Sequence, residues 1–101
     1  MVINLTKKLD KIFHDRTRLA IMSTLLASQH DVSFSDLVKR LEVTRGNLSV
    51  HMKVLEDNKF IKSKKAFVNN KPRTTFRATA KGREAFEQYL TILEEIINAI
   101  K

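Results

Sequence analysis

Residues 44–53 bring together side chains whose chemistry suits the edges of DNA bases. Arginine can donate two hydrogen bonds to guanine, asparagine can pair in the same two-point way with adenine, and valine can touch the methyl group of thymine. The segment holds two cations, one amide and no acid. Gly46 lets the backbone approach a groove wall closely, because it has no side chain. The candidate DNA-contacting residues are Thr44, Arg45, Gly46, Asn47, Ser49, Val50 and Lys53.

The positive charge of the chain is concentrated just after this segment. Overall, 19 Lys and Arg stand against 11 Asp and Glu, a net charge of +8. Residues 59–83 hold nine of these cations and no acid, whereas residues 84–101 hold four acids and one cation. A solvated surface normally interleaves both signs, so a block of one sign predicts a polyanion as partner. The candidate contacts in this block are Lys62, Lys64, Lys65, Asn70, Lys71, Arg73 and Arg77.

The sequence has no arrangement typical of catalysis or of metal binding. The histidines, at 14, 30 and 51, do not have the spacing of a zinc site. The absence of cysteine removes thiolate ligands and cysteine nucleophiles. We therefore expect no enzyme, no metal and no other cofactor. His51, on an otherwise apolar face, is expected to be half buried beside a polar partner, and His14 is expected to form a charge pair with Asp15.

The segments that position these residues form one short domain over 1–101. A chain of 101 residues is too short for two cores, and no apolar run reaches the roughly 20 residues of a membrane helix. Apolar spacing and capping residues predict an N-terminal helix within 1–14, starting near Leu5, and a second helix from Asp15 to about Gln29. A helix-turn-helix is expected over 33–57, with Ser33 and Thr44 as the caps of its two helices. Turn residues at 69–73 predict a two-stranded hairpin over 60–79, and Thr79 starts a last helix over 80–101. The expected fold class is α+β, mostly α.

The order helix-turn-helix, basic hairpin, helix resembles the small winged helix-turn-helix transcriptional regulators related to the MarR and ArsR types. Residues 44–57 resemble the family's recognition helix, and residues 73–83 resemble its second wing strand and the entry into the last helix. The resemblance implies a homodimer on double-stranded DNA, with recognition helices in adjacent major grooves and wings on the flanking minor groove or backbone. The chain departs from the family at Glu42, where glycine is frequent, and it lacks the cysteine ligands of ArsR-type metal sensors.

The last helix has more apolar surface than one small domain needs. Two apolar stripes with helical spacing run along it, and one stripe is enough to cover a domain core. We expect the surplus, together with apolar residues of the N-terminal helix, to form a homodimer interface. The candidate residues of this interface are Leu5, Leu9, Ile12, Phe86, Tyr89, Leu90, Leu93, Ile96, Ile97 and Ile100.

These features favour a sequence-specific transcriptional regulator over two alternatives. A non-specific architectural chromatin protein would also use a basic wing, but it would have no need of Asn47 and Val50 on the recognition face. A winged-helix protein–protein module fits poorly with an acid-free hairpin. The first residues lack the apolar core and cleavage site of a secretory signal, so a cytoplasmic location is expected. No residue pattern identifies a small-molecule effector.

Overall fold

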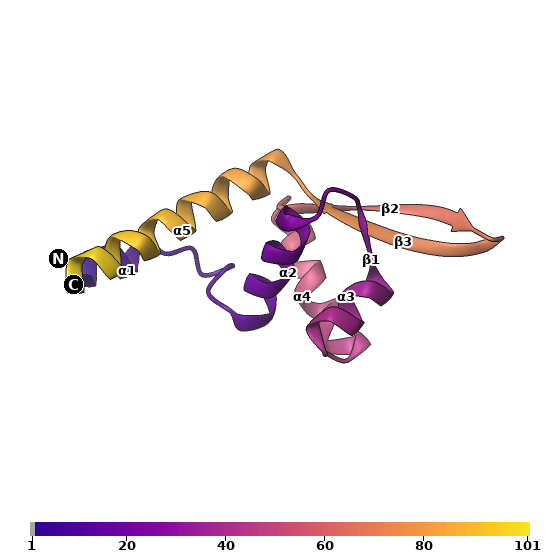
Figure 1. The fold of residues 1–101 in the computed structure, drawn as a ribbon, viewed down its shortest axis with the longest axis horizontal. Coiled ribbons are helices and arrows are strands. Elements are labelled where there is room, and N and C mark those ends of the chain that lie inside the picture. Colours follow the sequence, from indigo (N-terminus) through magenta and orange to yellow (C-terminus); the bar gives the residue numbers. More distant parts are fainter. Residues whose placement is uncertain (1) are drawn as a thin grey trace.

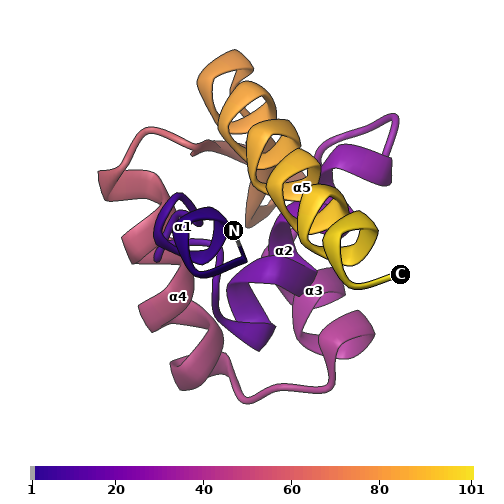
Figure 2. The same ribbon diagram turned by 90° about the vertical axis from the view of Figure 1, so that its left-hand side faces the viewer.

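The computed structural model describes residues 2–101, and Figure 1 shows their fold. In chain order the elements are α1 (Val2–Lys7), α2 (Arg16–Ala27), β1 (Val32–Ser33), α3 (Phe34–Leu41), α4 (Arg45–Asp57), β2 (Ile61–Val68), β3 (Lys71–Ala78) and α5 (Ala80–Ile100). The molecule is elongated, with extents of 55 × 26 × 22 Å. The hairpin of β2 and β3 extends from one end, and α1 lies beside α5 at the other (Figures 1 and 2). The mostly helical α+β winged-helix fold predicted from the sequence is confirmed.

Four side-chain caps begin the longer helices where the sequence predicts them. Each cap oxygen accepts a hydrogen bond from the backbone N–H three residues ahead, a donor that the helix itself leaves unpaired. Because this chemistry is local, the predicted starts of α2 to α5 are confirmed. The pairs are Asp15 with Arg18, Ser33 with Asp36, Thr44 with Asn47, and Thr79 with Gly82.

The turn between α3 and α4 depends on Glu42, whose backbone is left-handed, with φ 53° and ψ 46°. Glycine is favoured at such a position because any Cβ is crowded there. This crowding explains why glycine is frequent here in the family that the sequence resembles. The N–H of Val43 donates to the carbonyl of Val38 at 3.4 Å and closes the end of α3. The turn therefore forms with glutamate, at a backbone cost of about 1 kcal/mol.

The sheet has three antiparallel strands in the order β1-β3-β2, where the sequence predicted two. β1 pairs only with Thr75 and Phe76 of β3, and a strand of two residues leaves no alternating pattern to recognise. The turn is also shorter than the predicted 69–73. Asn69 and Asn70 alone form it, with φ of 54° and 63°, and two residues of positive φ match the twist of the flanking strands. The rest of the predicted turn belongs to β3.

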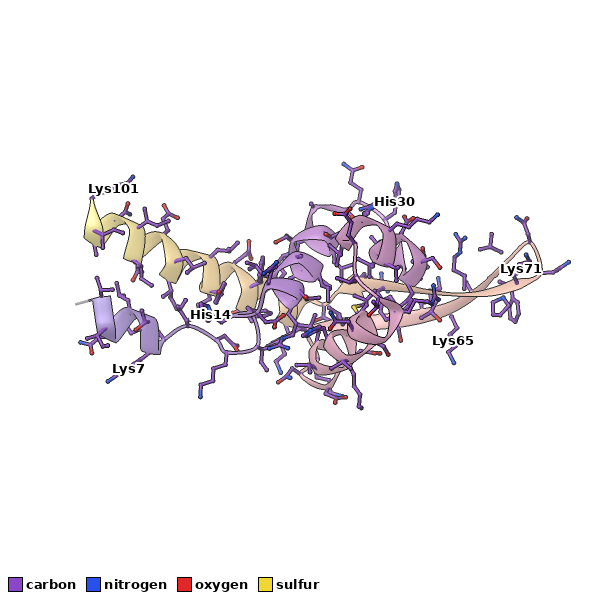
Figure 3. All side chains as sticks on the ribbon, turned by 90° about the horizontal axis from the view of Figure 1, so that it is seen from below. Lys7, His14, His30, Lys65, Lys71 and Lys101 are labelled. Atoms are coloured by element: carbon purple, nitrogen blue, oxygen red, sulfur yellow. The ribbon has the colours of Figure 1, made fainter. Side chains whose placement is uncertain are left out.

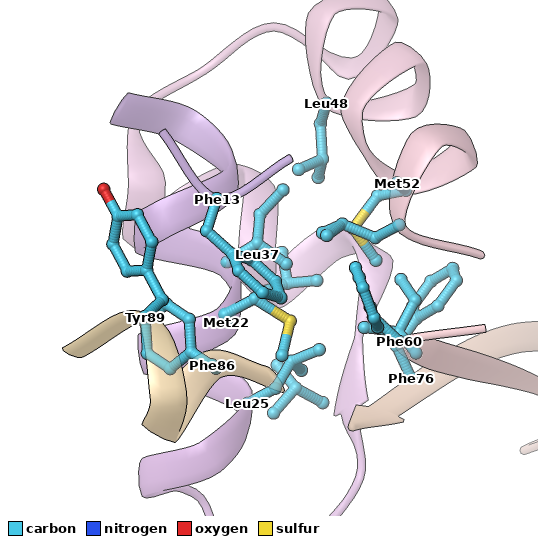
Figure 4. Packing of buried hydrophobic residues seen from close by; sticks show 14 residues of the cluster. Phe13, Met22, Leu25, Leu37, Leu48, Met52, Phe60, Phe76, Phe86 and Tyr89 are labelled. Atoms are coloured by element: carbon cyan, nitrogen blue, oxygen red, sulfur yellow. The ribbon is translucent and has the colours of Figure 1, made fainter. Parts of the chain in front are cut away.

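An aromatic cluster holds α5 against the helical body (Figure 4). The buried ring of Phe13 has its centroid 4.8 Å from that of Phe60, 5.3 Å from that of Phe86 and 5.8 Å from that of Tyr89. Phe86 and Tyr89 are each 3% exposed. Their expected place in a dimer interface is therefore corrected, because both belong to the core of a single chain.

The N-terminal helix is shorter than expected and covers only part of the segment 1–14. It begins at Val2, before the expected start near Leu5, and ends at Lys7. The carboxylate of Asp10 accepts a hydrogen bond from the N–H of Ile12 at 2.8 Å, a local bond that competes with a continuing helix. Leu9 and Ile12 pack against the core, so neither presents a free face to a partner. Within residues 2–101 no helix combines the length and apolarity needed to cross a membrane.

Candidate nucleic-acid interface

α4 buries one face in the core and exposes the other along its length. Leu48, Met52 and Leu55 are at most 3% exposed and fix the helix against the body. All seven candidate residues of this segment, from Thr44 to Lys53, are exposed, and Val50 is 63% exposed. An exposed apolar side chain is unfavourable in water, and contact with the methyl group of a thymine would remove part of its surface from water. The helix thus presents a mixed polar and apolar strip of the kind that reads a major groove.

Arg45 is held in place by an aromatic ring. The guanidinium carbon of Arg45 lies 5.0 Å from the ring centroid of Phe34, the first residue of α3. The ring of Phe34 also lies 6.3 Å from that of Phe76 in β3. Phe34 therefore links the recognition helix to both α3 and the wing. Sequence reasoning missed this residue, because no local pattern connects the start of α3 with the start of α4.

Lys53 has a partner that the sequence analysis did not assign. Its Nζ lies 3.3 Å from a carboxylate oxygen of Asp57, one helical turn on. Both side chains are largely exposed, and an exposed pair of this kind contributes little to stability. A phosphate can therefore replace the carboxylate of Asp57 at small cost.

Three polar side chains join the back of α4 to the start of α2. Nη1 of Arg18 lies 3.0 Å from Nδ1 of His51, and Oδ1 of Asp15 lies 3.7 Å from the same nitrogen. The backbone N–H of Arg18 donates a hydrogen bond to Oδ1 of Asp15. This bond favours the ionised carboxylate and is the main reason why the pKa of Asp15 lies below its usual 3.8. His51 is half buried beside polar partners, as expected. His14 does not pair with Asp15, because its Nδ1 lies 3.0 Å from the hydroxyl of Tyr89.

The wing carries its cations on exposed positions without acidic partners. Within residues 2–101 no Asp or Glu oxygen lies within 4.0 Å of a wing cation's nitrogen. Residues directly opposite in a hairpin share a face, and the register puts all but one of the cations on the same face. Lys65 is the exception and lies on the other face. Figure 3 shows Lys71 at the tip of the hairpin. The cations on the common face are Lys62, Lys64, Lys71, Arg73 and Arg77. Asn70, the remaining candidate, lies in the turn.

A cleft of about 630 Å³ separates the wing from α3 and the start of α4. Arg45 contributes to one wall, and Lys71 and Arg73 contribute to the other. No acid lines this cleft within the described part of the chain. Three cations facing one open cleft suit a sugar-phosphate backbone, because phosphate contacts position a protein on DNA. The structure thus brings together residues from the two candidate groups that the sequence placed far apart.

The remaining dimer candidates belong to α1 and to α5, whose C-terminal half lies beside α1 at the end of the molecule opposite the wing (Figure 1). Leu90, Ile97 and Ile100 are 44%, 51% and 72% exposed. Leu5 and Ile96 are half buried, whereas Leu93 packs against the core, as Leu9 and Ile12 do, and does not belong to this surface. Ile3 of α1, 65% exposed, adds to this surface and was not singled out from the sequence. These residues leave an apolar strip on α1 and the second half of α5.

No group of three His, Asp or Glu side chains in residues 2–101 is placed to hold a metal ion. Two of the three histidines take part in the polar contacts described above, His14 with Tyr89 and His51 with Arg18.

Comparison with known proteins agrees with this geometry. A protein-family model described as a winged helix DNA-binding domain matches residues 17–97. An uncharacterized protein of Methanocaldococcus jannaschii is 35% identical over 80 residues, which cover 79% of this chain and 86% of that protein. The structure of a transcriptional regulator homologue from Pyrococcus horikoshii is similar with a TM-score of 0.85 and 32% identity, over 99% of this chain and 96% of that chain. The crystal structure of MarR shares the fold, with a TM-score of 0.76 and 16% identity over 97% of this chain and 70% of MarR. The chain belongs to the winged helix DNA-binding domain family, a family of transcriptional regulators and not of enzymes.

Proposed function

We propose that this protein is a sequence-specific transcriptional regulator that binds double-stranded DNA as a homodimer. The observation that carries the proposal is the exposed face of α4, where Arg45, Asn47 and Val50 are accessible to a partner and none of the three is acidic. These three side-chain types discriminate guanine, adenine and thymine edges in the major groove. A protein that only coats DNA needs cations, and it needs neither the amide nor the valine.

The recognition helix and the wing divide the work in this proposal. α4 enters the major groove and contacts bases through the seven candidate residues. The wing cations contact the flanking backbone and minor groove, which raises affinity but carries little sequence information. The cleft between Arg45 and the wing cations Lys71 and Arg73 supports this division, because it offers the intervening backbone a cationic channel.

The homodimer in this proposal forms through α5 and α1. Its support is the exposed apolar strip that includes Leu90, Ile97 and Ile100, at the end away from the cationic wing. Two-fold pairing there would set the two recognition helices about 34 Å apart, one turn of DNA, to match a palindromic site. The protein would act on chromosomal DNA in the cytoplasm.

Selection of duplexes from a random pool at near-physiological salt tests the proposal. The expected result is a defined motif with two-fold symmetry. Retention of DNA without any motif would instead indicate the architectural role. Failure to bind any duplex even at low salt would overturn DNA binding and leave a protein–protein module. A control variant with Lys62, Lys64 and Lys65 replaced by alanine should select the same motif with lower yield, because the wing positions the protein without reading bases.

A further inference from the structure

The wing tip exposes apolar side chains in the most cationic part of the molecule. Phe67 is 79% exposed and Val68 is 43% exposed, both at the end of β2. Phe67 stands directly opposite Pro72 of β3, so the two side chains share one face of the hairpin. Figure 3 shows this tip, marked by Lys71, far from the helical body. No element of the chain therefore covers Phe67, and none of the DNA contacts proposed above uses it.

The surroundings of Phe67 identify a polyanion as its partner. One aromatic side chain buries about 150–250 Å², whereas a stable protein interface takes about 800 Å² from each partner. Phe67, Val68 and Pro72 are too few to supply that area. A second copy of the tip is also disfavoured, because each copy presents Lys65 and Lys71 with no acid nearby. Nucleic acid has the complementary charge and offers apolar sugar and base surfaces.

The distance of Phe67 from the turn matches the depth of the DNA minor groove. Asn69 and Asn70 form the tip, and Phe67 lies two positions before Asn69. At about 3.4 Å per strand residue this separation is about 7 Å, and the minor groove is about 7.5 Å deep. When the turn reaches the groove floor, Phe67 and Pro72 therefore lie against the deoxyribose walls.

We propose that Phe67, backed by Pro72, is an apolar wedge that enters the minor groove and packs against the deoxyribose rings of its walls. Lys65, Lys71 and Arg73 neutralise the phosphates on either side of the wedge. The inference rests on the proposed DNA-binding function and adds to it an apolar contact with the sugars of the flanking minor groove.

Comparison of Phe67→Ala with Lys65→Ala, two positions away on the same face of β2, separates an apolar contact from a charge contact. The affinity for a short fluorescein-labelled duplex recovered from the selection is measured over a range of salt concentrations. Phe67→Ala should lower affinity about tenfold, because it removes buried apolar surface, without changing the salt slope, because no charge is lost. Lys65→Ala should reduce the slope by about one unit. Phe67→Leu, which keeps an apolar wedge, should retain most of the wild-type affinity.

Hydroxyl-radical footprinting locates the contact, because these radicals attack deoxyribose from the minor groove. Wild type should protect the flanking minor groove, and Phe67→Ala should lose that protection while the major-groove contacts of α4 remain. Circular dichroism confirms that the exposed substitution leaves the fold intact. Wild-type affinity and footprint in Phe67→Ala would overturn the wedge alone. A change in sedimentation with an unchanged footprint would overturn it in favour of a protein contact. Failure of the wild type to bind any duplex would overturn the proposed function itself.

Discussion

The guanidinium of Arg45 lies over the ring of Phe34, with its carbon 5.0 Å from the ring centroid. Arg45 belongs to the first turn of α4 and Phe34 to the first turn of α3, so the contact joins the two helices of the helix-turn-helix at their N-terminal ends. An arginine in water samples many rotamers, and ordering it on binding costs free energy. The ring therefore holds Arg45 ready for a base or a phosphate.

Replacement of Phe34 by leucine should weaken DNA binding only through Arg45. Leucine keeps an apolar contact with Phe76 but removes the cation–π attraction, which is worth about 0.5–1 kcal/mol at exposed sites. We expect a loss of about two- to fivefold in affinity for the selected duplex. In a double-mutant cycle, Phe34→Leu should cost little more once Arg45→Ala is present. Additive losses would show that Phe34 acts independently of Arg45.

Asn47 and Lys64 should separate base reading from phosphate binding. Asn47→Ala should cost about 1–3 kcal/mol on the selected duplex and relax the motif at one position. Lys64→Ala should weaken all duplexes equally and reduce the salt slope by about one unit, from a wild-type magnitude of about 6 or more for a dimer. Titrations of specific and mixed-sequence duplexes measure both quantities. An unchanged ratio of specific to non-specific affinity in Asn47→Ala would remove Asn47 from the base-reading set.

The two glycines should respond to alanine with opposite signs. A Cβ added at Gly82 would overlap the carbonyl oxygen of Phe60 and lie 2.9 Å from its Cα, whereas nothing lies within 4 Å of a Cβ added at Gly46. Gly82→Ala should therefore lower the free energy of unfolding by about 1–3 kcal/mol. Gly46→Ala should raise it by up to about 1 kcal/mol, because alanine favours helix. If the backbone at Gly46 approaches DNA, the same variant loses affinity while it gains stability. Chemical denaturation and DNA titration of both variants measure these changes.

A charge on the apolar strip of α5 should abolish dimerisation. Ile97 is 51% exposed, so Ile97→Glu leaves the monomer core intact and places a carboxylate in the proposed interface. Asn98→Glu adds the same charge at the next, exposed position and serves as the control. Sedimentation should report a folded monomer for Ile97→Glu and a dimer for Asn98→Glu. An Ile97→Glu protein that stays dimeric and binds the selected duplex normally would exclude this face as the interface.

Asp15 should make the stability of the domain depend on pH in the acidic range. The backbone N–H of Arg18 lowers the pKa of Asp15 in the folded state, so the unfolded chain takes up the proton first as the pH falls. The stabilisation is complete above the unfolded pKa of about 3.9 and is lost as the pH falls through the lower folded value. Asp15→Asn keeps a capping oxygen but cannot titrate. Unfolding measured at neutral and at strongly acidic pH should show a smaller loss in the variant than in the wild type.

Local chemistry made much of this protein readable from its sequence. The caps at Asp15, Ser33 and Thr44 act within one helical turn, and their predicted helix starts are confirmed. The division of α4 into a buried and an exposed face follows from helical periodicity alone. The concentration of cations in residues 59–83 can be counted directly in the sequence, and most of these residues belong to the wing strands β2 and β3.

Tertiary structure decided which apolar surfaces meet and which polar groups gather. Apolar residues at helical spacing, such as Phe86 and Tyr89, show that part of a helix is buried but not what buries it. Phe13, more than 70 residues earlier, packs against both rings. The contact of Arg45 with Phe34 and the short strand β1 likewise join segments that no local pattern connects. The physical reason is that the free energy of packing depends on which distant surfaces fit together. Periodicity along the sequence shows which face of each helix or strand is apolar. Which of these apolar faces pack against each other is determined only in the folded chain.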